Sequence, residues 1–190
     1  MKLPIVAYGD PVLRKKAADF APEEIAGLKQ LVADMYETMY NARGVGLAAP
    51  QVGLSKRLFV VDATPFDDEE PELKDFKKAF INPQILEETG EEWAFNEGCL
   101  SIPDIREDVY RLPEVRLSYY DENMLPHEET FKGMAARIIQ HEYDHIEGKL
   151  FTDKLSPLRK RMLEKRLTDI SRGVVKVDYK MKFPAVKKGR

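Results

Sequence analysis

The chain has 190 residues, of which 43% are hydrophobic and 33% are charged, a balance that suits one compact domain with a sizeable core. The apolar run near the N-terminus, Ile5 to Tyr8, is too short for a signal peptide, and no segment reaches the ~20 apolar residues of a membrane span. We therefore expect a soluble, cytoplasmic protein without a membrane role, and its single cysteine excludes an internal disulfide.

The net charge of −3 conceals an uneven distribution along the chain. An acidic cluster lies between Asp67 and Asp75, whereas the residues from Lys154 onwards include 13 Lys or Arg and only three acidic side chains. Solvated surface is the plainer interpretation of both, since charge runs usually are just that. The alternative for the basic C-terminal region is contact with RNA phosphates.

The first predicted element is an amphipathic helix over residues 22–41, where apolar residues recur at helical spacing and Gly44 lies just past the end. A stretch of small residues, 44–51, separates this helix from a predicted strand at 58–61. The charged segment 64–78 is expected to be an exposed loop.

The remainder of the chain is predicted to hold several strands and then two helices. Alternating apolar and aromatic residues predict strands at 80–86, 93–102, 115–120 and, after a turn at 121–123, at 128–131. One helix should run over 133–147 and end at Gly148. A last helix should open with Ser156 as its N-cap and continue to about Ser171.

The order of these elements predicts the fold class. A helix, many short strands and then helices favour an α+β fold, because βαβ repetition is missing. We expect mostly antiparallel sheets packed around a central helix, 133–147, with one helix N-terminal and one C-terminal to them. Residues 174–183 alternate weakly and are expected to form an edge strand or an arm.

The strongest chemical signal is the sequence His-Glu-Tyr-Asp-His at 141–145. Residues four apart share one face of a helix, so the imidazoles of His141 and His145 can reach one metal ion, with Glu142 beside it. Apolar residues flank the motif and indicate a buried helix, and a buried imidazole needs a partner. We therefore favour a metal site over the alternative of two core histidines.

The third ligand could be Cys99, His127, Glu164 or another carboxylate, because a hydrolytic metal ion usually keeps three protein ligands and one position for water. A zinc endoprotease would use Glu164 on the last helix. His127 lies in a polar turn region and is expected at the surface. A lone cysteine is more often a core residue, but the thiolate of Cys99 binds zinc, iron or cobalt well and is favoured beside such a helix.

The small-residue stretch 44–51 fits a GxGxxA dinucleotide-binding fingerprint, but its context does not. That fingerprint must follow a buried strand and open a helix, whereas here a helix precedes it and Pro50 follows. We interpret the small residues as permitting close packing or peptide approach, with Gln51 offering an uncharged amide donor. Gly98 would equally let another backbone approach closely.

Three segments together resemble the peptide deformylase family, whose signature is a GxGLAAxQ stretch, an EGCLS stretch and an HExxH helix in this order. The matching segments are Gly44-Val45-Gly46-Leu47-Ala48-Ala49-Pro50-Gln51, Glu97-Gly98-Cys99-Leu100-Ser101 and His141-Glu142-Tyr143-Asp144-His145. The separation of 42 residues between Cys99 and His141 is also in keeping with the family. The ordered triple is far more specific than any one motif, and the similarity extends from near the start to about Gly173.

The resemblance implies a metal-dependent hydrolase that removes the formyl group from the N-terminal formyl-methionine of nascent polypeptides and releases formate. Cys99, His141 and His145 would hold one divalent ion, with Glu142 as general acid/base. Fe(II) is the ion that the resemblance suggests, although Zn(II), Ni(II) or Co(II) suit the same ligands.

The resemblance also assigns the groups that would hold the substrate. The Gln51 amide and the Leu100 backbone N–H would stabilise the oxyanion, and Val45, Gly46 and Gly98 would pair with the substrate backbone like an added strand. The partner is accordingly an N-formyl-methionyl peptide.

Domain organisation and further partners are expectations at this point. Residues 1–173 would form a single catalytic deformylase domain, and 174–190 a basic C-terminal arm or edge strand. The basic C-terminal region would dock at the ribosome, where the substrate emerges.

Some features depart from the family or favour another class of protein. Arg137, one turn before His141, is charged where a methionine pocket suggests an aliphatic residue, and the acidic segment 64–78 has no evident role. A zinc endoprotease using Glu164 is the alternative enzyme, and a non-catalytic module with a closed metal site is a third hypothesis. The presence of Glu142 disfavours that third hypothesis.

Overall fold

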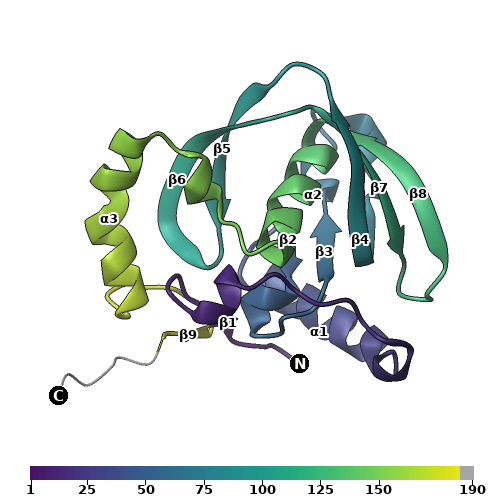
Figure 1. The fold of residues 1–190 in the computed structure, drawn as a ribbon, viewed down its shortest axis with the longest axis horizontal. Coiled ribbons are helices and arrows are strands. Elements are labelled where there is room, and N and C mark those ends of the chain that lie inside the picture. The colour runs from purple at the N-terminus through teal and green to yellow at the C-terminus, as the bar shows by residue number, and fades with distance from the viewer. Residues whose placement is uncertain (185–190) are drawn as a thin grey trace.

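The fold is built around one buried helix, as the computed structural model shows for residues 1–184, the part of the chain that it describes (Figure 1). Helix α2 (Gly133–Ile146) lies between a five-stranded sheet and a two-stranded hairpin. Helix α1 (Leu28–Asn41) packs on the far side of the sheet, and α3 (Pro157–Ser171) lies outside the hairpin. This arrangement confirms the predicted α+β fold around a central helix.

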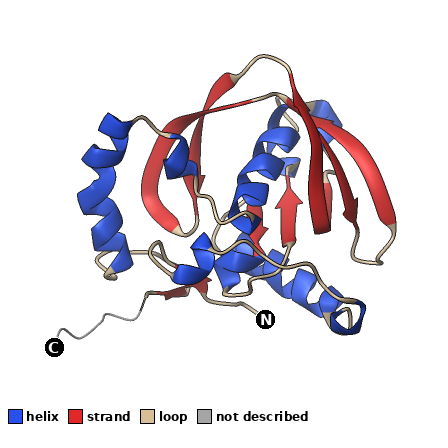
Figure 2. Ribbon diagram, in the orientation of Figure 1, coloured by secondary structure: helices blue, strands red, loops and turns tan. Residues whose placement is uncertain are grey.

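The strands form three groups, and Figure 2 shows the two larger ones on opposite sides of α2. The five-stranded sheet is antiparallel throughout, in the order β2 (Gly46–Ala48), β3 (Leu58–Asp62), β4 (Lys77–Thr89), β7 (Glu114–Tyr120) and β8 (Pro126–Lys132). The hairpin joins β5 (Trp93–Cys99) to β6 (Ile102–Arg111). A short parallel pair joins β1 (Ile5–Val6) to β9 (Met181–Lys182), which are the two ends of the described chain.

Strand β3 is packed against α2 on one face and against α1 on the other. All five of its residues are buried. Phe59 and Val61 contact the apolar cluster that includes Ile138 and Ile139 of α2, whereas Leu58 and Val60 contact the cluster on the α1 side. Because both faces are covered by helices, the strand reads as a continuous apolar run instead of an alternating one.

Several predicted elements are confirmed at their expected places. Helices α2 and α3 and strands β3, β7 and β8 agree with their predictions to within a few residues. The Ser156 side chain accepts a hydrogen bond from the Arg159 backbone N–H, as an N-cap does, and Pro157 follows it at the first helical position.

Two predicted boundaries are wrong. The helix expected over 22–41 is a 3-10 turn at Pro22–Glu24 followed by α1, because the chain turns between them through Gly27 at a φ of 89°. The strand expected over 93–102 is two strands, since the chain reverses at Leu100–Ser101. That turn contains no Gly, Pro, Asn or Asp, and strand β6 after it was therefore missed.

The acidic segment 64–78 is more structured than the exposed loop that was expected. It contains 3-10 turns at Thr64–Phe66 and Pro71–Leu73, and Leu73 is buried in the core. Both carboxylate oxygens of Glu70 accept from the Met134 backbone N–H, at 3.0 and 3.1 Å. The segment therefore supplies a cap to the N-terminus of α2.

The predicted edge strand or arm at 174–183 contains β9, which pairs with β1 beside the main body (Figure 1). Residues 185–190, the end of the expected basic arm, lie outside the described residues. In the part of the chain that the structure describes, no helix is long and apolar enough to cross a bilayer.

Candidate metal centre

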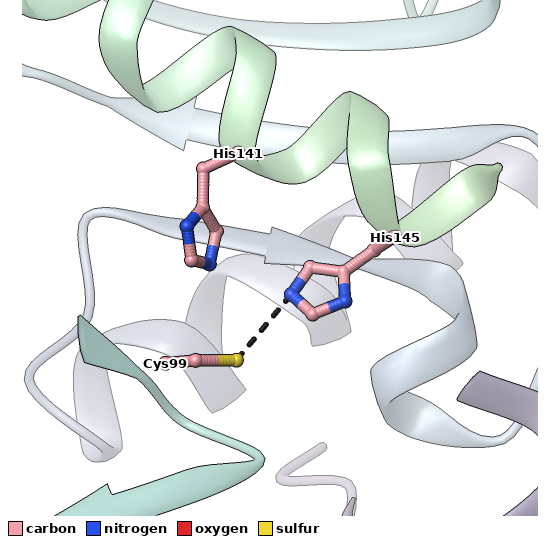
Figure 3. A group of neighbouring side chains, drawn as sticks. All are labelled: Cys99, His141 and His145. Carbon is pink, nitrogen blue, oxygen red and sulfur yellow. Dashed lines mark hydrogen bonds between the residues drawn. The ribbon is translucent and has the colours of Figure 1, made fainter. Parts of the chain in front are cut away.

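The structure brings together the three residues expected to hold a metal ion (Figure 3). The ligand atoms of Cys99, His141 and His145 all lie within 4.8 Å of one another. The Sγ atom of Cys99 is 3.4 Å from Nε2 of His145. Both imidazoles are buried, with 9% and 1% of their residue surfaces exposed.

Local structure explains this convergence. His141 and His145 lie four residues apart on α2, so their rings project from one face of the helix toward the hairpin (Figure 3). Cys99 is the last residue of β5, directly after an irregularity in its pairing with β6 at Gly98. Regular pairing of the two strands stops at this irregularity, and there the sulfur of Cys99 faces the two imidazole rings.

The chemistry of this donor set fits a divalent metal ion. Bonds of about 2.3 Å to sulfur and 2.0–2.1 Å to nitrogen at a tetrahedral angle place the two donor atoms roughly 3.5 Å apart, close to the 3.4 Å found. Burial lowers the pKa of His141, but hydrogen bonds to Cys99 and Glu97 outweigh it and leave this pKa raised. Burial holds the pKa of His145 well below its usual range, which leaves this imidazole neutral, the form that ligates a metal ion.

Glu97 organises the residues behind His141. Its carboxylate accepts from Nδ1 of His141 at 2.9 Å, from Arg111 at 2.7 and 3.0 Å, and from Arg137 at 2.9 Å. Burial raises the pKa of Glu97, but the hydrogen bonds from His141 and Arg111 lower it by more, so the carboxylate stays ionised. It therefore fixes the His141 ring with Nε2 toward the metal position.

Sequence reasoning quoted Glu97 only as part of a motif and missed Arg111 altogether. Arg111 ends β6, is 3% exposed, and also donates to Asp144 at 2.8 Å. The available signal was a carboxylate two residues before the cysteine. On one strand such residues face the same side, so Glu97 and Cys99 both project toward α2.

Glu142 lies beside the three ligands with one carboxylate oxygen unused. It is 4% exposed, and its Oε2 atom has no hydrogen-bond partner within residues 1–184. Burial raises the pKa of Glu142 to about 7, against the opposing charges of His141 and Arg111. A carboxyl group with such a pKa is suited to take up and release a proton near neutral pH.

Gln51 is held so that its amide nitrogen faces the cysteine. Its Oε1 atom accepts from the Ala48 backbone N–H at 2.9 Å. Its Nε2 atom consequently lies 3.4 Å from Cys99 Sγ and 3.3 Å from the hydroxyl of Ser101. Leu100, between these two, contributes to the same site from the turn after β5.

A cavity of about 920 Å³ opens on this site. Its lining includes Gln51, Leu100 and the three residues predicted to pair with substrate, Val45, Gly46 and Gly98. An apolar part is formed by Phe66, Phe95, Met134 and Ile138. The expected site residues other than His145 therefore line one cavity.

Arg137 also lines this cavity, but its charge is already paired. The side chain is 2% exposed, donates to Glu97 and to the carbonyl oxygens of Trp93 and Val109, and stacks over the Trp93 ring at 4.3 Å. At this point the cavity wall therefore carries an arginine whose charge is balanced by Glu97.

The two competing ligands lie apart from the centre. Glu164 is exposed on α3, and the endoprotease hypothesis loses its third ligand. His127 is half-buried on β8, where it pairs with Asp121 at 3.0 Å and stacks on Tyr119. Neither joins the metal-binding group, although His127 is less exposed than its predicted surface position implied.

Comparisons with known proteins agree with this geometry. The family model described as polypeptide deformylase matches residues 2–161. The chain belongs to the peptide deformylase family. It is 60% identical to the peptide deformylase of Christiangramia forsetii and 58% identical to that of Flavobacterium johnsoniae, with each alignment covering 100% of both chains.

Solved deformylase structures share the fold. The peptide deformylase from Legionella pneumophila superposes with a TM-score of 0.79 at 39% identity, covering 92% of this chain and 98% of the other. The enzyme from Thermus thermophilus gives 0.78 at 42% identity, covering 90% and 97%. This deformylase is accordingly a metal-dependent hydrolase with a Cys/His/His site.

Proposed function

We propose that this deformylase removes the formyl group from N-terminal formyl-methionine of nascent polypeptides, releasing formate, with Glu142 as its general acid/base. The unused Oε2 atom of Glu142, buried beside Cys99, His141 and His145, is the observation that carries the proposal. A buried ionisable oxygen without a hydrogen-bond partner calls for an explanation, and proton transfer supplies one. We assign the water that attacks the formyl carbon as the group from which this oxygen takes a proton.

The residues of this chain would divide the reaction between them. A divalent ion held by Cys99, His141 and His145 would activate water and polarise the formyl carbonyl. Glu142 accepts a proton as water attacks the formyl carbon. It then gives the proton to the amine nitrogen when the carbon–nitrogen bond breaks, so that formate and a free N-terminus leave.

Charge that develops on the formyl oxygen would be stabilised by two donors. We assign these to the Gln51 amide and the Leu100 backbone N–H. The hydrogen bond from Ala48 that orients the Gln51 side chain supports this assignment, since a fixed donor needs no reorganisation during the reaction. In comparable sites the loss of one such donor costs about 3–4 kcal/mol in the transition state.

The substrate backbone would lie along Val45, Gly46 and Gly98 as an added strand, because all three line the cavity beside the donors. The methionine side chain would enter the apolar part that contains Phe95 and Ile138. Arg137 is compatible with an apolar substrate group, since its charge is paired with Glu97.

The test of this function is the variant Glu142→Ala, assayed on a formyl-methionyl peptide under anaerobic conditions. We expect full metal content and a loss of about 10²–10⁴-fold in kcat, the range that general acid–base groups contribute. Glu164→Ala, exposed on α3 and outside the lining of this cavity, is the control. Near-normal turnover by Glu142→Ala would refute the assignment.

The ligand set is tested separately by comparing Cys99→Ser with Glu164→Gln. The first variant should lose tightly bound metal, and the second should keep both metal and activity because Glu164 is exposed on α3. The opposite result would restore the endoprotease hypothesis.

We further propose Fe(II) as the ion in the cell. A ligand set of one thiolate and two imidazoles also accepts Zn(II), Ni(II) or Co(II), and affinity order does not decide which ion a cell supplies. Metal analysis on protein purified without oxygen, followed by loss of activity in air, tests this choice. A protein that contains zinc when purified in this way, and that keeps its activity in air, would contradict the choice of Fe(II).

A cytoplasmic location and ribosome contact belong to the same proposal. Exposed basic side chains on α3 support the contact, because substrate emerges beside ribosomal RNA. Arg159 is paired with Glu107 at the protein surface, so charge reversal at Lys160, Arg161 and Lys165 is the cleaner probe. If the triple variant bound ribosomes with the affinity of the parent, and salt did not weaken that binding, the proposed contact would be wrong.

A further inference from the structure

The C-terminal arm, residues 174–183, returns to the active site after α3. It ends in β9, which pairs with β1 at the other end of the chain (Figure 1). Between α3 and β9, the residues 176–179 line the same cavity as the expected metal ligands Cys99 and His141. The last segment of the described chain is therefore part of the wall of the catalytic cavity.

Tyr179 makes the direct connection between this arm and the predicted catalytic groups. Its hydroxyl donates to the Leu100 carbonyl oxygen at 2.7 Å. The half-buried ring packs in the same apolar cluster as Leu100 and Met181. The hydrogen bond and the packing of the ring together hold the Tyr179 side chain against the backbone of Leu100.

The turn at Leu100–Ser101, which follows the metal ligand Cys99, is held from several directions. The Ser101 carbonyl accepts from the Tyr8 backbone N–H at 2.8 Å. The Leu100 side chain packs against Gly44, where an added Cβ would lie 2.7 Å from Cδ1 of Leu100. Tyr179 adds the contact to the backbone of Leu100 itself.

We propose that Tyr179 is a positioning residue for deformylation, whose hydroxyl holds the Leu100 backbone so that the Leu100 N–H faces the formyl oxygen. This inference rests on the role proposed above for Leu100. The N–H and the carbonyl of Leu100 flank one α-carbon, so anchoring the carbonyl at Tyr179 and the preceding residue at the metal site restricts both backbone torsions. The stabilisation given by such a donor depends steeply on its alignment.

A purely structural role predicts something different. If Tyr179 only attached the arm to the body, losing its hydroxyl would lower the melting temperature and leave kcat unchanged. If it positions Leu100, the loss falls on kcat, because the Leu100 donor acts on charge that develops in the transition state. Measuring kcat and the melting temperature of the same variant therefore separates the two roles.

The experiment compares Tyr179→Phe with Tyr36→Phe, measuring kcat, KM, metal content and melting temperature with a formyl-methionyl peptide. Tyr36 is a matched control, since it is another partly buried tyrosine packed against the same cluster, but on α1 and outside the cavity lining. We expect Tyr179→Phe to lower kcat about tenfold, with KM within twofold and metal retained, and Tyr36→Phe to behave like the parent.

Two outcomes would overturn the positioning role. One is an unchanged kcat in Tyr179→Phe, and the other is a loss that Tyr36→Phe shares or that follows loss of metal. Failure of the underlying function is distinguishable, because the parent enzyme would then lack deformylase activity or Glu142→Ala would retain it.

Discussion

Gly46 leaves room for the neighbouring side chain of Glu142 as well as for the proposed substrate strand. A Cβ added at this position would lie 2.8 Å from both Cγ and Cδ of Glu142, and closer still to Oε1. These atoms belong to a buried side chain with little room to move. The glycine therefore sets the position of the carboxylate that is proposed to carry the proton.

The variant Gly46→Ala should accordingly damage catalysis more than folding. We expect the displaced Glu142 carboxylate to reduce kcat at least tenfold while the metal content stays at that of the parent, because none of the three ligands is touched. Steady-state kinetics with metal analysis on the same sample provide the measurement. Parent-like kcat would show that Glu142 has another position from which it can act.

Glu97 is the residue on which the surroundings of the metal centre depend most. It is buried and accepts hydrogen bonds from His141, Arg111 and Arg137. In Glu97→Gln, the amide cannot neutralise two guanidinium groups, and we expect metal affinity to fall about 10–100-fold. Competition against a chelator measures this, with the exposed Glu91→Gln as control. Unchanged affinity would mean that Arg111 and Arg137 find other partners.

Helix α2 depends on a cap that comes from another segment of the chain. The residue before it, Lys132, makes no side-chain capping bond, and Gly133 opens the helix at a φ of 54°. The carboxylate of Glu70 takes the place of a local cap by accepting from Met134. The acidic segment thus contributes to the position of the helix that carries both histidine ligands.

We expect Glu70→Ala to destabilise the protein by about 1 kcal/mol, the usual effect of losing an N-cap. For a domain of this size, that corresponds to a fall of about 2–4 °C in melting temperature. The neighbouring Glu69→Ala, exposed and without such a contact, should have no measurable effect. Equal melting temperatures for the two variants would argue against the capping role.

Elements with strong local signals were predictable. Helix α3 has a Ser-Pro start, and α2 has apolar periodicity that ends at Gly148. Strand β6 was missed although its burial alternates regularly, because the turn before it carries no Gly, Pro, Asn or Asp and its Ser101 is a weak signal alone. The break at Gly27 was missed because a single glycine is also tolerated within helices.

The site was predictable only as far as its residues are marked by motifs. His141, His145 and Glu142 follow from residue type and helical spacing, whereas Cys99 was favoured by its thiolate chemistry and by the resemblance to the family. Arg111, Glu70 and Tyr179 act through contacts with residues 14, 64 and 79 positions away. Sequence periodicity carries no information about such distant pairs, and so their roles required the fold.

At the scale of the whole molecule, the metal ion should act as a cross-link between the hairpin and α2. Cys99 comes from one and His141 and His145 from the other. Binding to the folded state alone stabilises it by about 4 kcal/mol when free metal exceeds its dissociation constant 1,000-fold.

We therefore expect chelation to lower the melting temperature of the parent by at least about 5 °C, while Cys99→Ser melts at one temperature with or without chelator. Calorimetry of both proteins with and without added metal measures the difference. If the melting temperature of the parent did not change when the metal was removed, a cross-linking role would be contradicted.

The pairing of β1 with β9 has a consequence for synthesis. Strand β1, near the start of the described chain, can pair only after β9 has been made, so the contact of Tyr179 with Leu100 forms late in synthesis. The part of the cavity wall that residues 176–179 supply is therefore added after α2 and the hairpin have already been made.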